Sequence, residues 1–150
     1  MKGYRFERKR QKTMIKQTEF EIVGDLNDPR GQIKKIAQNV DVLNITSAAG
    51  TKRAAHYHRQ SSHLCRLNKG KMHYYERLAG SQECPKLVVI NPGDYFFTGP
   101  VTEHLMSFVE NSEFDCYSFG SREQENYEND LVRLDFDLEE IYKAYPYQNG

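Results

Sequence analysis

Short apolar runs separated by turn residues fill most of this chain. Between Thr18 and Phe119 the runs alternate polar and apolar residues, and turn residues recur about every eight to twelve positions. No long helical periodicity interrupts this pattern. Many short strands joined by closely spaced turns are typical of a β-sandwich or a β-barrel. The sequence therefore predicts an all-β fold.

Turn-forming residues set the bounds of the expected strands. Residues 24–31 are rich in Gly, Asn, Asp and Pro and predict a turn, and residues 68–71 predict a hairpin turn between two strands. Near the end of the chain, 131–136 fits a strand, and the residues after it fit a short helical or extended tail. The other expected strands are 18–23, 32–37, 40–46, the histidine-bearing segment 50–63 and its continuation 63–68, 72–78, 86–90 (expected to be buried), 95–98, 104–109 and 114–119.

The length and the charge distribution predict one domain with an appended arm. A chain of 150 residues fits a single hydrophobic core. The formal net charge is +0, which gives no overall field to attract nucleic acid or a membrane. Basic residues are concentrated at the start of the chain and acidic residues towards its end. We therefore expect a basic flexible N-terminal arm at 1–17 and a single barrel domain at 18–150, and we do not expect nucleic acid as a partner.

The N-terminus and the cysteines indicate a cytoplasmic protein without a membrane segment. The N-terminal charges are not followed by an apolar run, so a secretory signal is not expected, and no stretch is apolar enough for a membrane span. The three cysteines, Cys65, Cys84 and Cys116, are odd in number and form no CxxC pair. This usage fits reduced thiols better than a disulfide framework.

The histidines predict a metal site inside the barrel. His56 and His58 are two positions apart, so on a strand both imidazoles point to the same face. His63 follows after an expected bend, and His104 comes from a distant strand. Imidazole is a common ligand of divalent transition metals, and three or four converging ligands make a reactive site. We expect His73 to be an ordinary strand residue.

The spacing of these histidines resembles the two signature motifs of the cupins. Gly50, His56, His58, His63 and Gly70 follow the spacing of the first motif, which normally has Glu at the position of His63. The second motif runs from a Gly to a His eleven positions later, an interval that Gly93 and His104 reproduce, although the turn residues between them match less well. The resemblance implies a double-stranded β-helix, or jelly-roll barrel, in which His56, His58, His63 and His104 bind a divalent metal such as Zn, Fe, Mn, Ni or Cu.

Two segments are similar to one branch of the cupins, the nucleotide-sugar epimerases and ketoisomerases. Asp28–Ile33 resembles their D-x-R-G-x-hydrophobic segment, and Arg53–Arg59 resembles R-G-x-H-x-H-K with Ala54 in place of the Gly. The resemblance implies that His56 and His58 move protons and that Arg30 or Arg53 contacts a phosphate or sugar oxygen. Cys65 shares a strand face with His63, so we also expect it near the substrate. The chain differs from the ketoisomerases in having His63 where they carry Gln. It also has His104, which an enzyme that works without a metal would not require.

Three functions remain open at this point. The first is an isomerase or epimerase of a sugar or nucleotide-sugar that works through histidine- or metal-assisted proton transfer. The second is an Fe- or Cu-dependent dioxygenase-type oxidoreductase acting on a small molecule. The third is a small-ligand-binding cupin without turnover. In each case the expected partner is a small molecule, and we also expect a homodimer because cupins commonly pair through their sheets.

Overall fold

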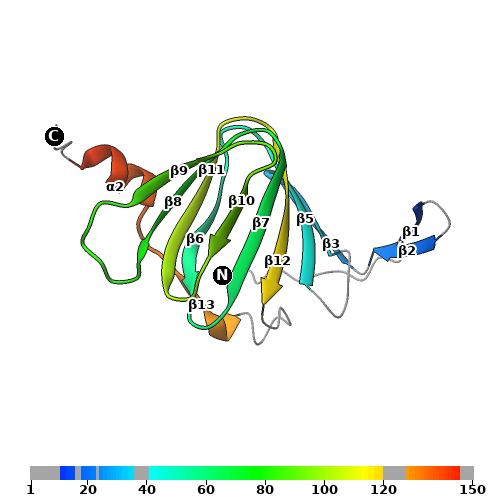
Figure 1. Ribbon diagram of the computed structural model, residues 1–150, viewed down its shortest axis with the longest axis horizontal. Helices are drawn as coiled ribbons and strands as arrows, with labels where there is room; N and C mark the ends of the chain where they lie inside the picture. Colours follow the sequence, from blue (N-terminus) through cyan, green and yellow to red (C-terminus); the bar gives the residue numbers. More distant parts are fainter. Residues whose placement is uncertain (1–10, 16–17, 23, 36–40, 120–127, 146–150) are drawn as a thin grey trace.

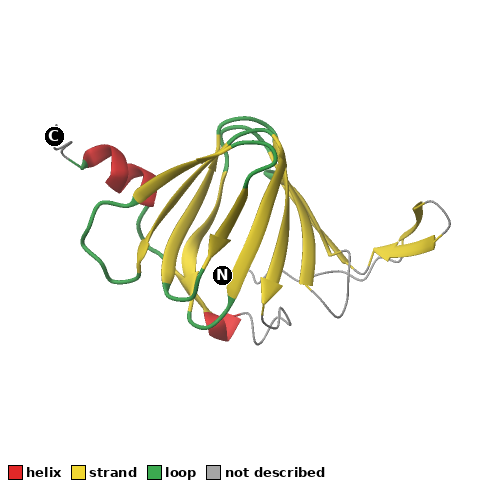
Figure 2. Cartoon of the chain, in the orientation of Figure 1, coloured by secondary structure: helices red, strands yellow, loops and turns green. Residues whose placement is uncertain are grey.

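The computed structural model describes residues 11–15, 18–22, 24–35, 41–119 and 128–145 (Figure 1). Figure 2 shows that strands dominate, as the sequence predicted. The elements are β1 (Gln11–Ile15), β2 (Thr18–Ile22), β3 (Gly24–Asp28), β4 (Gly31–Lys35), β5 (Asp41–Ser47), β6 (Lys52–His58), β7 (Ser62–Lys69), β8 (Met72–Leu78), β9 (Lys86–Ile90), β10 (Tyr95–Thr98), β11 (Thr102–Phe108), β12 (Ser112–Phe119), β13 (Leu131–Arg133) and the helix α2 (Leu138–Ala144).

Two antiparallel sheets form the body of the molecule. A six-stranded sheet has the order β10-β7-β12-β5-β4-β3, and a five-stranded sheet has the order β13-β6-β11-β8-β9. The chain passes repeatedly from one sheet to the other, which is the topology of a jelly roll. Strands β1 and β2 pair separately as a hairpin, and β1 lies within the range expected as the N-terminal arm. The predicted all-β jelly-roll fold with a short helical tail is confirmed.

The core lies between the inner faces of the two sheets. Along β7, for example, alternate residues point inward and the residues between them point outward, as the sequence pattern predicted. The buried apolar residues of this core are Leu43, Ile45, Cys65, Leu67, Met72, Tyr74, Ile90, Phe96, Met106, Phe108, Phe114 and Cys116. They come from both sheets, so the core is shared between the sheets rather than belonging to one of them.

The hairpin expected at residues 68–71 is absent, and this prediction was wrong. Strand β7 pairs with β10 and β12, whereas β8 pairs with β11 and β9, so the turn carries the chain between sheets. Gly70 makes this crossing possible, because its φ is +92° and a Cβ atom would collide with the backbone of Asn111 at 2.5 Å. Local sequence marks a sharp turn but does not say which sheet the next strand joins.

Two further expectations need correction. Residues 24–31 are not one long turn, because β3 and β4 form a hairpin whose turn is only Pro29 and Arg30. Asp28 stabilises that turn by accepting a hydrogen bond from the backbone N–H of Arg30 at 2.9 Å. Strand β9 is fully buried only at Ile90, because it forms an edge of the five-stranded sheet and Val89 is exposed.

The C-terminal segment covers the outer face of the five-stranded sheet. Leu138 of α2 is 1% exposed and packs with Tyr75 and Leu105 in a second apolar cluster. Asp137 caps the helix by accepting hydrogen bonds from the first free backbone amides of α2, and it also pairs with Lys52 at 2.8 Å. Among the described helices, none has the length and apolar character needed to span a membrane.

Candidate metal centre

Neighbouring strands of the five-stranded sheet bring three histidines together. His56 and His58 lie on β6, and His104 lies on β11 directly opposite His56. Their ligating atoms all lie within 4.8 Å of one another. The ring centroids of His56 and His104 are 4.6 Å apart, and those of His58 and His104 are 5.8 Å apart. We call these residues the three-histidine group.

A bulge in β6 positions this group. Ala54 and Ala55 both have left-handed backbone angles, with φ of +70° and +59°, and the register between β6 and β11 shifts at Leu105. Regular alternation would have placed Ala54 on the face of His56 and His58. The extra residue breaks that alternation, so Arg53 is buried instead, at 7% exposure.

A backbone carbonyl sets the tautomer of His104. Its Nδ1 lies 2.9 Å from the carbonyl oxygen of Thr102. Because a carbonyl only accepts, Nδ1 carries the proton and Nε2 keeps its lone pair. Burial, together with the neighbouring His58 and His63, lowers the pKa of His104 to about 3 against a hydrogen bond with Thr102 that raises it, so the ring is neutral near pH 7. A neutral imidazole with a bare Nε2 is the form that binds a metal.

A carboxylate performs the same task for His58. Its Nδ1 lies 3.1 Å from Oδ2 of Asp130, in the short helical turn before β13. The other oxygen of Asp130 accepts the backbone N–H of Gln60 at 2.7 Å. Burial raises the pKa of Asp130, but hydrogen bonds from Ser61, Gln60 and His58 outweigh it, so the pKa is lowered and the group stays ionised. Carboxylates often orient metal-binding histidines in this way.

His63 lies beside the three-histidine group but not within it. It belongs to β7, in the other sheet, and its ring centroid is 4.4 Å from that of His58. Its Nδ1 lies 2.8 Å from the hydroxyl of Ser118, its cross-strand neighbour, and 3.7 Å from the sulfur of Cys116. His63 thus takes its position from the six-stranded sheet.

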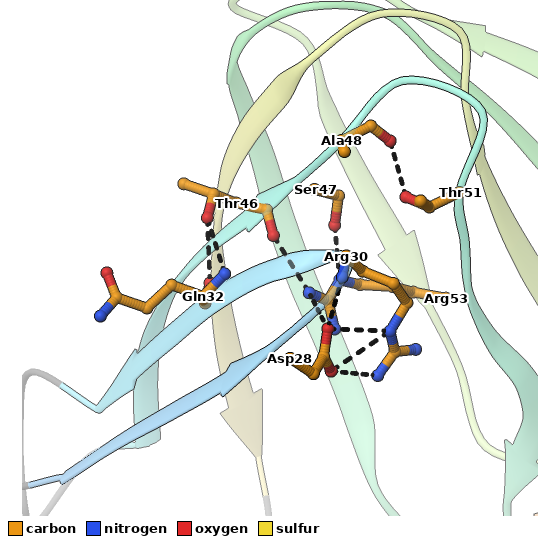
Figure 3. Close-up of polar contacts among 8 residues, drawn as sticks. All are labelled: Asp28, Arg30, Gln32, Thr46, Ser47, Ala48, Thr51 and Arg53. Carbon is orange, nitrogen blue, oxygen red and sulfur yellow. Dashed lines mark hydrogen bonds and ion pairs between the residues drawn. The ribbon is translucent and has the colours of Figure 1, made fainter.

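The two arginines named by the sequence gather around a carboxylate instead of the histidines (Figure 3). Arg30 forms an ion pair with Asp28, and this contact lowers the pKa of the Asp28 carboxyl. Arg53 donates to the hydroxyl of Ser47 and to the carbonyl of Thr46, and its guanidinium lies 3.9 Å from Asp28. Both side chains are therefore held by protein groups.

Arg30 borders a separate hollow at the other end of the barrel. This hollow has a volume of about 450 Å³, and its lining includes Arg30, Lys69 and Ser112. Ser112 and Ser118 lie at opposite ends of β12, six residues apart, which corresponds to about 20 Å of strand. Ser118 contacts His63, so the hollow and the histidines lie at opposite ends of the barrel.

Cys65 is placed in the middle of the core. It is 1% exposed and lies directly opposite Cys116 across β7 and β12. His73, which the sequence left outside the metal site, lies on β8 outside the three-histidine group.

Glu76 is a polar residue near the histidines that the sequence analysis missed. It lies on β8 directly opposite His104, so both side chains share the inner face. Burial raises the pKa of Tyr74, and a hydrogen bond from Tyr74 to Glu76 raises it further, which places the carboxylate beside that hydroxyl. The available signal was the spacing of Met72, Tyr74 and Glu76, which puts a carboxylate on the stripe of core-facing residues.

The donor atoms of the three-histidine group fit a divalent transition metal. Three imidazoles suit Zn, Fe, Ni or Cu, and a site with three protein ligands keeps positions open for a small molecule. His104 and His58 each have Nδ1 engaged by an oxygen, which directs Nε2 to the ligand role. His56 is half-buried, whereas His58 and His104 are buried, so the group is approached from the side of His56.

Solved structures resemble this fold, although no family model and no curated protein matches the sequence. The capsular polysaccharide assembling protein CapF from Staphylococcus aureus matches with a TM-score of 0.65 and 12% identity over 75% of this chain. The present chain spans about a third of the CapF chain, at 34%. The Fe(II) protein HppE matches with a TM-score of 0.51 and 11% identity, over 63% of this chain and 55% of its own.

One match covers most of both chains. A variant of the QdtA 3,4-ketoisomerase from Thermoanaerobacterium thermosaccharolyticum, in complex with TDP, has a TM-score of 0.52 and 22% identity. The match covers 82% of this chain and 92% of that one. All three proteins have cupin domains. Because the two-sheet topology and these matches agree, the chain has the cupin fold.

Proposed function

We propose that this protein is a metal-dependent isomerase or epimerase that acts on a sugar or a nucleotide-sugar. The observation that carries the proposal is the three-histidine group, whose ligating atoms lie within 4.8 Å of one another. The match to a 3,4-ketoisomerase of nearly the same length supports the choice of reaction. A divalent metal held by His56, His58 and His104 would act as a Lewis acid and stabilise negative charge on a carbonyl oxygen.

Some residues around the three-histidine group orient its rings, and others form the surface that a substrate would contact. Asp130 and the carbonyl of Thr102 orient His58 and His104, so these two rings keep fixed directions. His56 is the more accessible ring and therefore lies on the side from which a substrate approaches. Met106 and Phe108 continue the inner face of β11 beyond His104 and provide apolar walls that exclude water.

Elemental analysis and isotope exchange test the proposal together. Protein purified without an affinity tag should contain about one transition-metal ion per chain. In D₂O it should introduce deuterium at the carbon beside the ketone of a 4-keto-6-deoxy nucleotide-sugar, detected by NMR. His104→Gln should lose both properties, and His73→Gln, on β8 outside the group, should keep both. No exchange across a panel of such sugars would refute the reaction.

One observation favours a second candidate, an Fe- or Cu-dependent oxidoreductase. The three-histidine group contains no carboxylate, and neutral imidazoles suit Fe(II) and Cu. The structural match to an Fe(II) protein points the same way. This candidate requires native iron or copper together with oxygen consumption on a small diketone, thiol or phenol. A metal-loaded protein that binds a sugar calorimetrically without exchange or oxygen uptake would instead be a binding cupin.

We also propose that the protein is a cytoplasmic homodimer. Strand β10 is an edge of the six-stranded sheet and exposes Tyr95 at 62% and Phe97 at 56%, which gives a second copy an apolar surface to cover. Cys65, Cys84 and Cys116 form no disulfide, which suits a reducing compartment. A monomer in light scattering at micromolar concentration would refute the dimer.

A further inference from the structure

Glu76 is a carboxylate residue that lies beside the three-histidine group. It lies on β8 directly opposite His104 on β11. Side chains that oppose each other in antiparallel strands lie on one face with Cβ atoms about 4.5–5.5 Å apart. Glu76 and His104 are therefore cross-strand neighbours on the inner face of the sheet. Glu76 is not among the residues whose ligating atoms lie within 4.8 Å of one another, so it stands beside the group and not in it.

A chain of hydrogen bonds holds this carboxylate. The hydroxyls of Tyr74 and Thr98 lie 2.6 Å apart, and both residues are buried. The Thr98 contact lowers the pKa of Tyr74, whereas the Glu76 contact raises it. Because a carboxylate only accepts, the Tyr74 hydroxyl donates to Glu76, and the Tyr74 oxygen accepts from the hydroxyl of Thr98. One carboxylate oxygen is thereby anchored, and the carboxylate has a second oxygen with which to accept a proton.

Exposure separates the residues that can touch a substrate from those that cannot. Tyr74, His58 and His104 are each no more than 3% exposed. Glu76 and His56 are half-buried, so they keep access to solvent. A general base must lie within hydrogen-bond reach of the atom that loses the proton. Glu76 meets this condition as an accessible carboxylate that is not a metal ligand, whereas the half-buried Asp130 is engaged by Nδ1 of His58 and by the backbone N–H of Gln60.

We propose that Glu76 is the general base of the isomerase or epimerase reaction, and this inference rests on the proposed function. Its carboxylate takes a proton from the carbon beside the substrate carbonyl. The electrons of the broken C–H bond form a C=C bond, and the carbonyl oxygen becomes an enediolate oxygen. In an isomerase Glu76 then delivers that proton to the neighbouring carbon, while the hydroxyl proton of the first carbon passes to the former carbonyl oxygen and leaves the ketone at the first carbon. In an epimerase a proton from water adds to the other face of the same carbon, and Glu76 releases its proton to water. Tyr74 and Thr98 are positioning residues.

The test compares three variants in the metal-loaded, full-length protein. Glu76→Gln keeps the shape and the hydrogen bond from Tyr74 but cannot accept a proton. Glu76→Asp keeps a carboxylate that is one methylene shorter. Glu83→Gln makes the same chemical change at an exposed loop position and serves as the control. For each protein we would measure deuterium exchange into 4-keto-6-deoxy nucleotide-sugars, kcat and KM separately, metal content and thermal unfolding.

We expect Glu76→Gln to lose about 100-fold or more in exchange rate and kcat, because a general base contributes about that much. Its KM and metal content should match the wild type, and Glu76→Asp should retain part of the activity that Glu76→Gln loses. Tyr74→Phe should lower kcat by a smaller factor with KM unchanged, since it frees the carboxylate without removing it. Glu83→Gln should behave as the wild type does.

The remaining outcomes overturn the inference. Loss of metal from Glu76→Gln would identify Glu76 as a ligand instead of a base. An exchange loss smaller than about tenfold, with metal retained, would show that another group takes the proton while the proposed function stands. If Glu76→Gln does not fold, wild-type exchange in Glu76→Asp refutes the role. A wild type that exchanges with no sugar refutes the proposed function itself, and the role of Glu76 with it.

Discussion

Replacing Asp130 with asparagine should weaken metal binding without touching a ligand. Asp130 accepts from the backbone N–H of Gln60 at 2.7 Å with one oxygen and contacts Nδ1 of His58 at 3.1 Å with the other. In the variant, the amide oxygen keeps the bond to Gln60 and the amide NH₂ faces His58. Nδ1 must then accept, so the ring proton moves to Nε2, the nitrogen that would bind the metal.

Metal affinity should fall because His58 no longer presents a bare Nε2 to the metal. Removing a carboxylate that orients a metal-binding histidine typically costs 10–100-fold in affinity, or about 1.4–2.7 kcal/mol. Zn²⁺ affinity would be measured by competition with a chromophoric chelator at fixed pH. Asp135→Asn, a matched change at an exposed carboxylate in the same segment, should bind as the wild type does.

Two results would refute this reasoning. Binding by Asp130→Asn within about threefold of the wild type would mean that the carboxylate does not set the tautomer of His58. An equal loss in Asp135→Asn would mean that the general charge of the segment matters and not the contact. The unfolding temperature of each metal-free variant must be compared first, so that a loss of affinity is not a loss of fold.

Three further outcomes follow from the same structure. Ala54→Gly should raise the free energy of unfolding by about 1 kcal/mol and the Tm by about 2–4 °C, because a φ of +70° suits Gly better than Ala. Ala49→Gly should give no gain, and thermal unfolding measures both variants. The pKa of His104 is about 3 in the metal-free protein against an ordinary 6.5, so the unfolded chain binds more protons between these values and stability falls as the pH drops below about 6.5. Urea titrations should show that fall, by at most about 1.4 kcal/mol per pH unit, and His104→Gln should reduce it. Asp137→Ala should lower the free energy of unfolding by about 1 kcal/mol through loss of the helix cap, and part of this difference should disappear in acid, because the lowered pKa of Asp137 stabilises the fold only above that pKa.

The strands could be predicted because alternation and turn residues are features of the local sequence. Strands 72–78, 86–90 and 95–98 have the bounds that alternation and turn residues gave them. Pairing is not local, and this is why the turn at 68–71 was taken for a hairpin when it joins two sheets. Whether two strands pair depends on contacts with β11 and β12, which come much later in the chain.

The candidate site was also only partly predictable from the sequence. Spacing located His56, His58 and His104, because motif positions and strand faces are sequence properties. Neither Asp130 nor Glu76 belongs to a motif, and each meets a histidine only through strand pairing. The bulge at Ala54 was also missed, since alanine does not mark a left-handed backbone as glycine would.

The three-histidine group belongs to one sheet, and its supports do as well. His56, His58 and His104 lie on β6 and β11, and Asp130 directly precedes β13, the next strand of that sheet. His63 belongs to the facing sheet. If a large ligand separates the two sheets, the distances among His56, His58 and His104 therefore stay constant while their distance to His63 increases. Movement of one sheet against the other would therefore leave the spacing of the three histidines unchanged.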